Sequence, residues 1–171
     1  VPDLFWRLEP GVELGYTEAD FARAIELFQG LDVDKAVADI DATFNALRAM
    51  PEVEASGLGY VGFCMGGKLA YLTATRTAAA CCVGYYGMGI EQMLDEADNI
   101  KGRLVLHFAE QDSYCDADAR TLISQRLGGH NNVEIYTYPD VDHAFARNGG
   151  MHYNKPAALM AHQRSIAALK Q

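Results

Sequence analysis

The sequence predicts an α/β protein in which a mainly parallel sheet carries helices on both faces. From residue 57 onward, short apolar runs alternate with stretches of helical spacing. Strands that alternate with helices are joined by crossover connections, and such connections make neighbouring strands parallel. The predicted strands are 58–63, 79–86, 103–108 and 133–138, and the predicted helices are 65–76, 91–97, 117–127 and 156–169.

Two amphipathic helices are predicted before the first strand. Residues 17–20 have the composition of a helix start, and four apolar residues then follow at helical spacing until Gly30. The second helix runs from 32 to 50 and is closed by Pro51. The two apolar stripes predict the buried faces. They consist of Phe21, Ala24, Ile25 and Phe28 in the first helix, and of Val33, Val37, Ile40, Phe44 and Leu47 in the second.

Composition favours one domain over residues 1–171, because half of the 171 residues are hydrophobic. Fourteen Lys and Arg against 23 Asp and Glu give a net charge of −9, which disfavours nucleic acid as a partner. No apolar stretch is long enough to cross a bilayer and no secretion signal is visible, so we expect a soluble, cytoplasmic protein. The four cysteines lack the paired spacing of a zinc site, which predicts reduced thiols and no metal.

Chemically reactive side chains follow three of the four predicted strands. Cys64 follows the first strand, within the segment GFCMGG, whereas Asp112 follows the third and His143 the fourth. A G-x-C-x-G segment between strand and helix is typical of a nucleophile elbow, whose small flanking residues avoid collisions with neighbouring elements. The helix start favours a thiolate, and the Met65 N–H can stabilise an oxyanion. For this segment alone, a buried cysteine in a glycine-rich turn remains the alternative.

The order of these residues along the chain favours catalysis. Nucleophile, acid and histidine, each after its own strand, form the order of the α/β-hydrolase triad. In this interpretation His143 accepts the thiol proton and Asp112 orients the imidazole. Asp140 and Asp142 are alternative acids, and Asp116 and Asp118 are expected to start the next helix. Surface or packing roles are expected for His107, His130, His152 and His162.

Several segments together resemble the dienelactone hydrolase (carboxymethylenebutenolidase) family of the α/β-hydrolase fold. They are PDLFWR at 2–7, GFCMGG at 62–67, GYYG at 84–87, QD at 111–112 and HAFAR at 143–147. The resemblance implies that Cys64 is the nucleophile, Asp112 the orienting acid and His143 the base. It also assigns Arg7, Arg147 and Tyr86 to substrate binding, with the two arginines holding a carboxylate.

The resemblance further implies a reaction without a cofactor. A small carboxylate-bearing enol-lactone, dienelactone, would be opened to maleylacetate through a thioester, since a thiolate attacks readily where an enolate leaves easily. A broader carboxylesterase or thioesterase of the same fold is one alternative, because a triad says little about the acyl group. A truncated, non-catalytic scaffold retained for binding or assembly is another.

The sequence departs from the family at its N-terminus. It starts at Val1, without the stretch of about 70 residues that would hold the first strands of the sheet. In the family this region supplies a glutamate that interacts with the thiol and a second oxyanion donor, and neither can be assigned here. The chain is therefore either a fragment or a short form whose exposed sheet edge favours a homo-oligomer.

Overall fold

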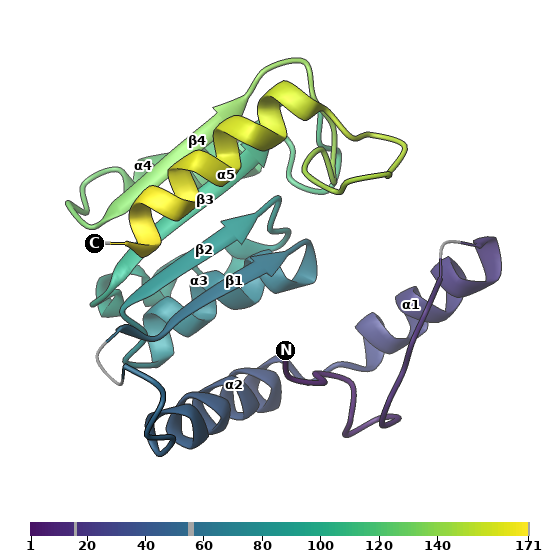
Figure 1. The fold of residues 1–171 in the computed structure, drawn as a ribbon. Coiled ribbons are helices and arrows are strands. Elements are labelled where there is room, and N and C mark those ends of the chain that lie inside the picture. The colour runs from purple at the N-terminus through teal and green to yellow at the C-terminus, as the bar shows by residue number, and fades with distance from the viewer. Residues whose placement is uncertain (16, 55–56, 171) are drawn as a thin grey trace. The chain divides into compact units, whose positions relative to one another are not determined.

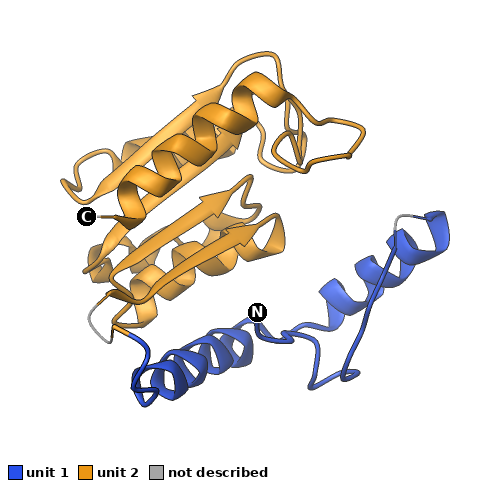
Figure 2. Cartoon of the chain, in the orientation of Figure 1, with its two compact units in different colours: residues 1–53 blue, residues 54–171 orange. Residues whose placement is uncertain are grey.

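A computed structural model of the protein describes residues 1–15, 17–54 and 57–170. The chain divides into two compact units, residues 1–53 and residues 54–171 (Figure 2). We describe each unit by itself, and the single domain over 1–171 stays a prediction. Among the described residues, no helix combines the length and the apolar character needed to cross a membrane.

The first unit contains the two predicted helices, α1 (Glu18–Gly30) and α2 (Val33–Arg48). A capping box between Thr17 and Asp20 begins α1, and the Asp32 side chain caps α2 by accepting the backbone N–H of Lys35. In α2 the predicted stripe is confirmed at its centre, because Val37, Ile40 and Phe44 are buried.

The predicted stripe of α1 is wrong as a buried face. Phe21 is 60% exposed and Ile25 is 38% exposed, whereas the buried residue of this helix is Leu27. Helical spacing and the N-terminal cap set the secondary structure, but burial also needs a packing partner on the same side. Periodicity therefore located this helix correctly without identifying its buried face.

The second unit is built on a four-stranded sheet in which every neighbouring pair is parallel (Figure 1). In spatial order its strands are β1 (Gly59–Phe63), β2 (Cys81–Tyr85), β3 (Arg103–Ala109) and β4 (Val133–Tyr138). Phe63 pairs with Tyr85, and Tyr85 pairs with His107. The carboxyl ends of the strands therefore meet at one edge, which is where the reactive residues follow.

Helices lie on both faces of this sheet, as predicted (Figure 1). One face carries α3 (Met65–Arg76), η2 (Ile90–Asn99) and α4 (Ala117–Leu127), and the other carries α5 (Lys155–Leu169). The helix predicted at 91–97 is the 3₁₀ segment η2, which is interrupted at Met93, whose φ of −123° is not helical.

The core of the second unit lies between the sheet and its helices. All five residues of β2 are buried, and so is most of α3. The four cysteines are free, and Cys81, Cys82 and Cys115 are buried.

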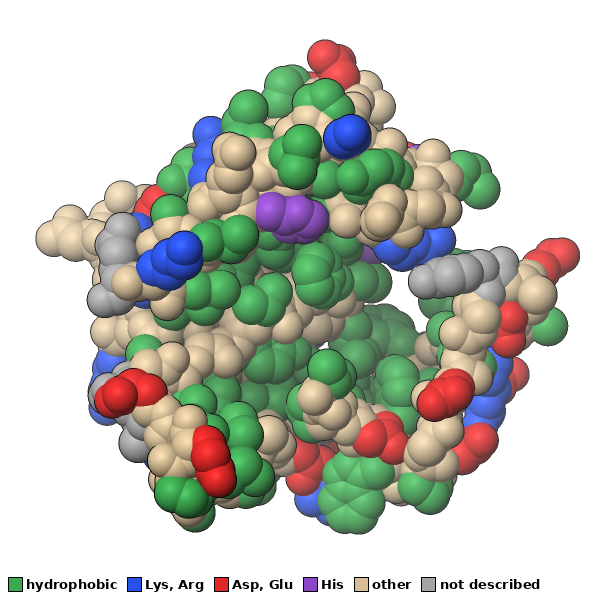
Figure 3. Space-filling view, viewed as in Figure 1, with side chains coloured by type: hydrophobic (Ala, Val, Ile, Leu, Met, Phe, Trp, Pro, Cys, Tyr) green, Lys and Arg blue, Asp and Glu red, His purple; other side chains and the backbone are tan. Residues whose placement is uncertain are grey.

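On the α5 side, apolar side chains gather over β1 and beside α5 (Figure 3). They include Val61, Phe63, Leu159, Ile166 and Leu169, each between 41% and 51% exposed. Self-association stays a prediction.

Candidate active site

Cys64 occupies a strained turn between β1 and α3. Its φ of 56° and ψ of −116° lie in a region that residues with a side chain rarely adopt. Its backbone N–H donates to the Tyr85 carbonyl over 3.0 Å, which ties the turn to β2. The Cys64 side chain makes no capping hydrogen bond to α3, so the sulfur remains available for chemistry. The structure thus has the backbone geometry that the elbow motif predicts.

The turn requires glycine at two positions, because a side chain there would collide with neighbouring backbone atoms. A Cβ on Gly62 would lie 1.9 Å from the Gly66 carbonyl oxygen, and a Cβ on Gly67 would lie 2.6 Å from that of Tyr85. A Cβ on Gly66 would meet only the Tyr60 hydroxyl, at an ordinary 3.5 Å. The prediction that both glycines of G-x-C-x-G avoid collisions is therefore right for Gly62 and wrong for Gly66. The second crowded position is Gly67, where α3 meets β2.

Asp112 and His143, from the loops after β3 and β4, form an ion pair. The His143 Nδ1 lies 2.8 Å from Asp112 Oδ2, and the Asp112 side chain is almost wholly buried. The other carboxylate oxygen accepts the Tyr114 backbone N–H over 2.8 Å. The loops after β3 and β4 are joined by the Gln111 N–H, which donates to the Val141 carbonyl. These contacts hold the imidazole in place through Nδ1, the nitrogen that is bonded to Asp112.

The electrostatics of His143 link it to Cys64 as well. Burial lowers the pKa of His143, but hydrogen bonds to Asp112 and to Cys64, with the charges of those two groups, raise the pKa to about 9. The structure therefore brings Cys64, His143 and Asp112 together at the carboxyl edge of the sheet.

The carboxylate bonded to the imidazole is that of Asp112 and not that of an alternative acid. Asp142 accepts the backbone N–H of His143 over 2.6 Å and pairs with His152 at 3.5 Å. Asp116 caps α4 by accepting the Ala119 N–H. Asp112 is the carboxylate bonded to the His143 ring in the part of the chain that the structure describes.

Four further positions line or flank the three reactive side chains. Met65 is the first residue of α3, so its N–H belongs to the helix start beside the sulfur. Buried Tyr86 lies with its ring centroid 5.0 Å from that of His143. Sequence reasoning missed Met88, whose Sδ is 3.9 Å from Cys64 Sγ, and Tyr114, whose ring is 4.9 Å from His143. Their proximity in sequence to Tyr86 and Asp112 was the available signal.

The two arginines expected to bind a carboxylate differ in their surroundings. Arg147 is exposed on the loop of His143, four residues further along, and its charge acts on the buried Tyr86 hydroxyl. Arg7 belongs to the first unit, where its Nε and Nη2 donate to Asp39 at 2.9 and 2.8 Å. Its guanidinium is therefore already occupied by a carboxylate, and its role in substrate binding stays a prediction.

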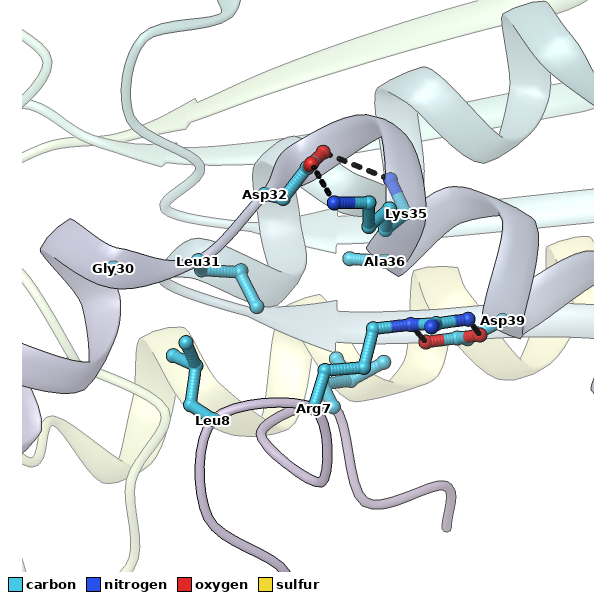
Figure 4. A pocket seen from close by; sticks show the side chains of 9 residues that line it. Arg7, Leu8, Gly30, Leu31, Asp32, Lys35, Ala36 and Asp39 are labelled. Carbon is cyan, nitrogen blue, oxygen red and sulfur yellow. Dashed lines mark hydrogen bonds and ion pairs between the residues drawn. The ribbon is translucent and has the colours of Figure 1, made fainter.

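A hollow of about 320 Å³ lies in the first unit (Figure 4). Its charged groups are the ion pairs Arg7–Asp39 and Lys35–Asp32. Its other lining residues are Leu4, Leu8, Gly30, Leu31 and Ala36. Because the charges are paired with one another, this hollow offers no unmatched group for a charged ligand. Within residues 1–15, 17–54 and 57–170, no three His, Cys, Asp or Glu side chains are grouped to hold a metal ion.

A strained residue between a parallel strand and a helix, followed by an acid and a histidine after later strands, defines a hydrolase of the α/β-hydrolase type. Comparison with known proteins gives its family. The whole chain, residues 1–171, matches the dienelactone hydrolase family, and the protein belongs to that family. It is a carboxymethylenebutenolidase-like hydrolase.

Individual relatives agree with this assignment. The chain is 37% identical to a protein of Azospirillum brasilense provisionally named a carboxymethylenebutenolidase, covering 99% of this chain and 73% of that protein. It is 34% identical to the carboxymethylenebutenolidase of Pseudomonas sp. strain P51, covering 99% and 71%. A crystal structure from Klebsiella pneumoniae, provisionally named a dienelactone hydrolase, superposes with a TM-score of 0.84 at 25% identity, covering 99% of this chain and 73% of that one.

Proposed function

We propose that this protein hydrolyses a small carboxylate-bearing enol-lactone, dienelactone, to maleylacetate, with Cys64 as nucleophile, His143 as base and Asp112 as the acid that orients it. The observation that carries the proposal is the strained backbone of Cys64 at the strand-to-helix turn, next to an imidazole bonded to Asp112. Relatives named carboxymethylenebutenolidase support the substrate class.

The proposed reaction has two halves. The Cys64 sulfur attacks the lactone carbonyl carbon while His143 holds the thiol proton, and the ring C–O bond breaks to leave an enolate and a thioester. His143 then delivers the proton to the departing oxygen. In the second half His143 removes a proton from water and the hydroxide adds to the thioester carbonyl. The C–S bond then breaks, and His143 returns the proton to the sulfur, which regenerates the thiol. The Met65 N–H is proposed to stabilise the oxyanion in both halves.

We assign the substrate carboxylate to Arg147. A guanidinium binds a carboxylate with paired, charge-assisted hydrogen bonds, which fixes both position and orientation. Arg147 is four residues from His143, on the same loop as the proposed base, and its charge acts on the Tyr86 hydroxyl. Tyr86 is assigned to the wall of the same site, because its ring contacts His143.

A broader carboxylesterase or thioesterase is the second candidate. The observation that favours it is the pairing of Arg7 with Asp39, which leaves one fewer guanidinium available for a substrate carboxylate. An enzyme with weaker carboxylate recognition would accept neutral esters, because the three proposed catalytic side chains specify acyl transfer but not the acyl group.

A substrate panel tests the proposal against this alternative. Purified protein is assayed with cis- and trans-dienelactone and with neutral p-nitrophenyl esters, next to the Cys64→Ala variant. We expect lactone opening with a higher kcat/KM than for the neutral esters, and no opening by Cys64→Ala. Equal or better turnover of neutral esters would support the broader esterase. Inactivity toward every substrate by the folded wild-type chain would support a non-catalytic scaffold.

A further inference from the structure

The aromatic ring of Tyr114 contacts the proposed general base. Its centroid is 4.9 Å from that of His143, at an interplanar angle of 66°. Tyr114 follows Asp112 by two residues, in the turn between β3 and α4. None of the motifs that indicate the reaction includes this residue, and the mechanism above gives it no role.

Burial does not explain why this ring lies where it does. Tyr114 is 53% exposed, whereas Tyr86, the other tyrosine that contacts His143, is 3% exposed. The Tyr86 ring also packs against Phe145 and Tyr85, which makes it part of the core. Within the described part of the chain, the ring contact found for Tyr114 is the one with His143. An exposed aromatic ring gains little from core packing, so its contact with the imidazole needs another reason.

The backbone holds Tyr114 firmly in this position. Its N–H donates to Asp112 Oδ1 over 2.8 Å, while Asp112 Oδ2 is 2.8 Å from His143 Nδ1. One carboxylate therefore fixes both the imidazole and the residue whose ring lies against it. This arrangement holds the backbone of Tyr114 next to the imidazole before substrate arrives.

We propose that Tyr114 is a positioning residue, whose ring holds the His143 imidazole in its catalytic orientation and stabilises the imidazolium formed when the thiol proton is transferred. This inference rests on the proposed function of Cys64 and His143. A cation over the face of an aromatic ring, within about 6 Å of its centroid, is stabilised by the electron density of that ring, and the two centroids here are 4.9 Å apart. The hydroxyl has no part in this role.

Two substitutions separate the ring from the hydroxyl. Tyr114→Leu removes the ring and keeps an apolar side chain, whereas Tyr114→Phe keeps the ring and removes only the hydroxyl. For Tyr114→Leu we expect kcat to fall about fivefold with KM unchanged, a change equal to about 1 kcal/mol at 1.36 kcal/mol per factor of ten. For Tyr114→Phe we expect the rate to be recovered. Because the side chain is half exposed, the thermal midpoints of both variants should match that of the wild type.

Alkylation of Cys64 by iodoacetamide gives a second readout that needs no substrate. We expect it to slow in Tyr114→Leu and to recover in Tyr114→Phe, because the imidazole assists thiolate formation. An unchanged kcat in Tyr114→Leu would overturn the proposal. So would a loss of rate in Tyr114→Phe, or a change confined to KM with alkylation unaltered, since both would indicate direct contact of the side chain with substrate.

The Cys64→Ala variant, assayed in parallel, separates this inference from the proposed function. If Cys64→Ala retains activity, the nucleophile assignment fails. If Cys64→Ala is inactive and Tyr114→Leu turns over like the wild type, only the role of Tyr114 fails.

Discussion

At the scale of single residues, the site depends on how two groups respond to their surroundings. His143 is partly buried, which alone would favour its neutral form, yet Asp112 and Cys64 raise its pKa to about 9. Its folded pKa therefore lies above the unfolded value of 6.5. The interaction stabilises the fold fully below about pH 6.5, and this contribution is lost as the pH rises through about 9.

The four cysteines are expected to differ sharply in reactivity. Burial raises the pKa of Cys81, Cys82 and Cys115, the last to about 12, so these remain thiols at neutral pH. Cys64 is partly exposed and lies next to the imidazole. With native protein and limiting iodoacetamide at pH 7, peptide mass spectrometry should find the label on Cys64, and the others should react only after unfolding. Equal labelling of Cys81 would contradict the assignment. His143→Ala should slow the labelling of Cys64.

Replacing Arg147 should separate substrate binding from chemistry. Arg147→Met keeps a long side chain but removes the charged hydrogen bonds, which are worth about 1.5 to 3 kcal/mol each. We expect KM for dienelactone to rise at least tenfold, roughly the loss of one such bond, while kcat changes little. A neutral p-nitrophenyl ester serves as the control and should be hydrolysed as by the wild type. If charged and neutral substrates slow equally, Arg147 does not hold the carboxylate.

At the scale of elements, the turn between β1 and α3 is set by close backbone contacts. Gly62 lies against the first turn of α3, and Gly67 lies against the end of β2. These contacts and the hydrogen bond from the Cys64 N–H to Tyr85 hold the sulfur at the sheet edge. The strain at Cys64 persists because strand, helix and neighbouring strand all constrain the same few residues.

Three alanine substitutions test this packing. Gly62→Ala and Gly67→Ala insert a methyl group 1.9 and 2.6 Å from carbonyl oxygens, so each should destabilise the protein by about 1 to 3 kcal/mol or more. Gly66→Ala is the matched control, because its methyl group would meet no atom closer than 3.5 Å. Urea midpoints should fall for the first two variants and hold for the third. A Gly62→Ala variant as stable as Gly66→Ala would contradict the steric account.

Much of the secondary structure could be predicted from the sequence, because local signals dominate it. The bounds of α3, α4 and β4 match the prediction to the residue. In α4 the start is set by the Asp116 cap. Features that depend on packing could not be predicted. The crowding at Gly67 depends on Tyr85 and Gly87, which are distant in the chain. The spacing of apolar residues also does not encode the buried face of α1 or the 3₁₀ form of η2.

The candidate site likewise contains residues that the sequence predicts and residues that only the fold brings together. Cys64, Asp112 and His143 were predictable because each follows a strand whose end lies at a shared edge. Met88 and Tyr114 were not, since neither belongs to a recognised motif and only the folded loops bring them to the reactive groups. The pairing of Arg7 with Asp39 is likewise a contact between residues 32 positions apart.

At the scale of the whole molecule, a buried polar network connects three strands with α5 in the second unit. His107 Nδ1 is 3.0 Å from the Tyr138 hydroxyl, and His107 Nε2 is 3.0 Å from Ser165 Oγ. The Ser165 hydroxyl in turn lies 2.6 Å from that of Tyr85. Tyr85 is the residue whose carbonyl binds the Cys64 N–H, so the network supports the strand on which the turn depends.

This network makes stability sensitive to acid. Burial, together with the charges of Arg164 and His162, lowers the pKa of His107 to about 3. The charge of Glu134 acts in the other direction and raises this pKa. The unfolded chain takes up this proton near pH 6.5, so protonation favours unfolding. The contribution of His107 to stability is full above about pH 6.5 and is lost as the pH falls toward 3. In His107→Gln, the free energy of unfolding should be lower at pH 7 but fall less steeply with acid. An equally steep fall would assign the sensitivity to other groups.

The most direct test of the account is to trap the acyl group during turnover. Wild-type protein is mixed with dienelactone, quenched in acid within the first turnovers, digested and analysed by mass spectrometry. We predict that the peptide containing Cys64 gains the mass of the opened lactone, in a form that hydroxylamine releases, and that Cys64→Ala neither turns over nor acquires this mass. Turnover by Cys64→Ala, or an acyl group on any other side chain, would contradict the account.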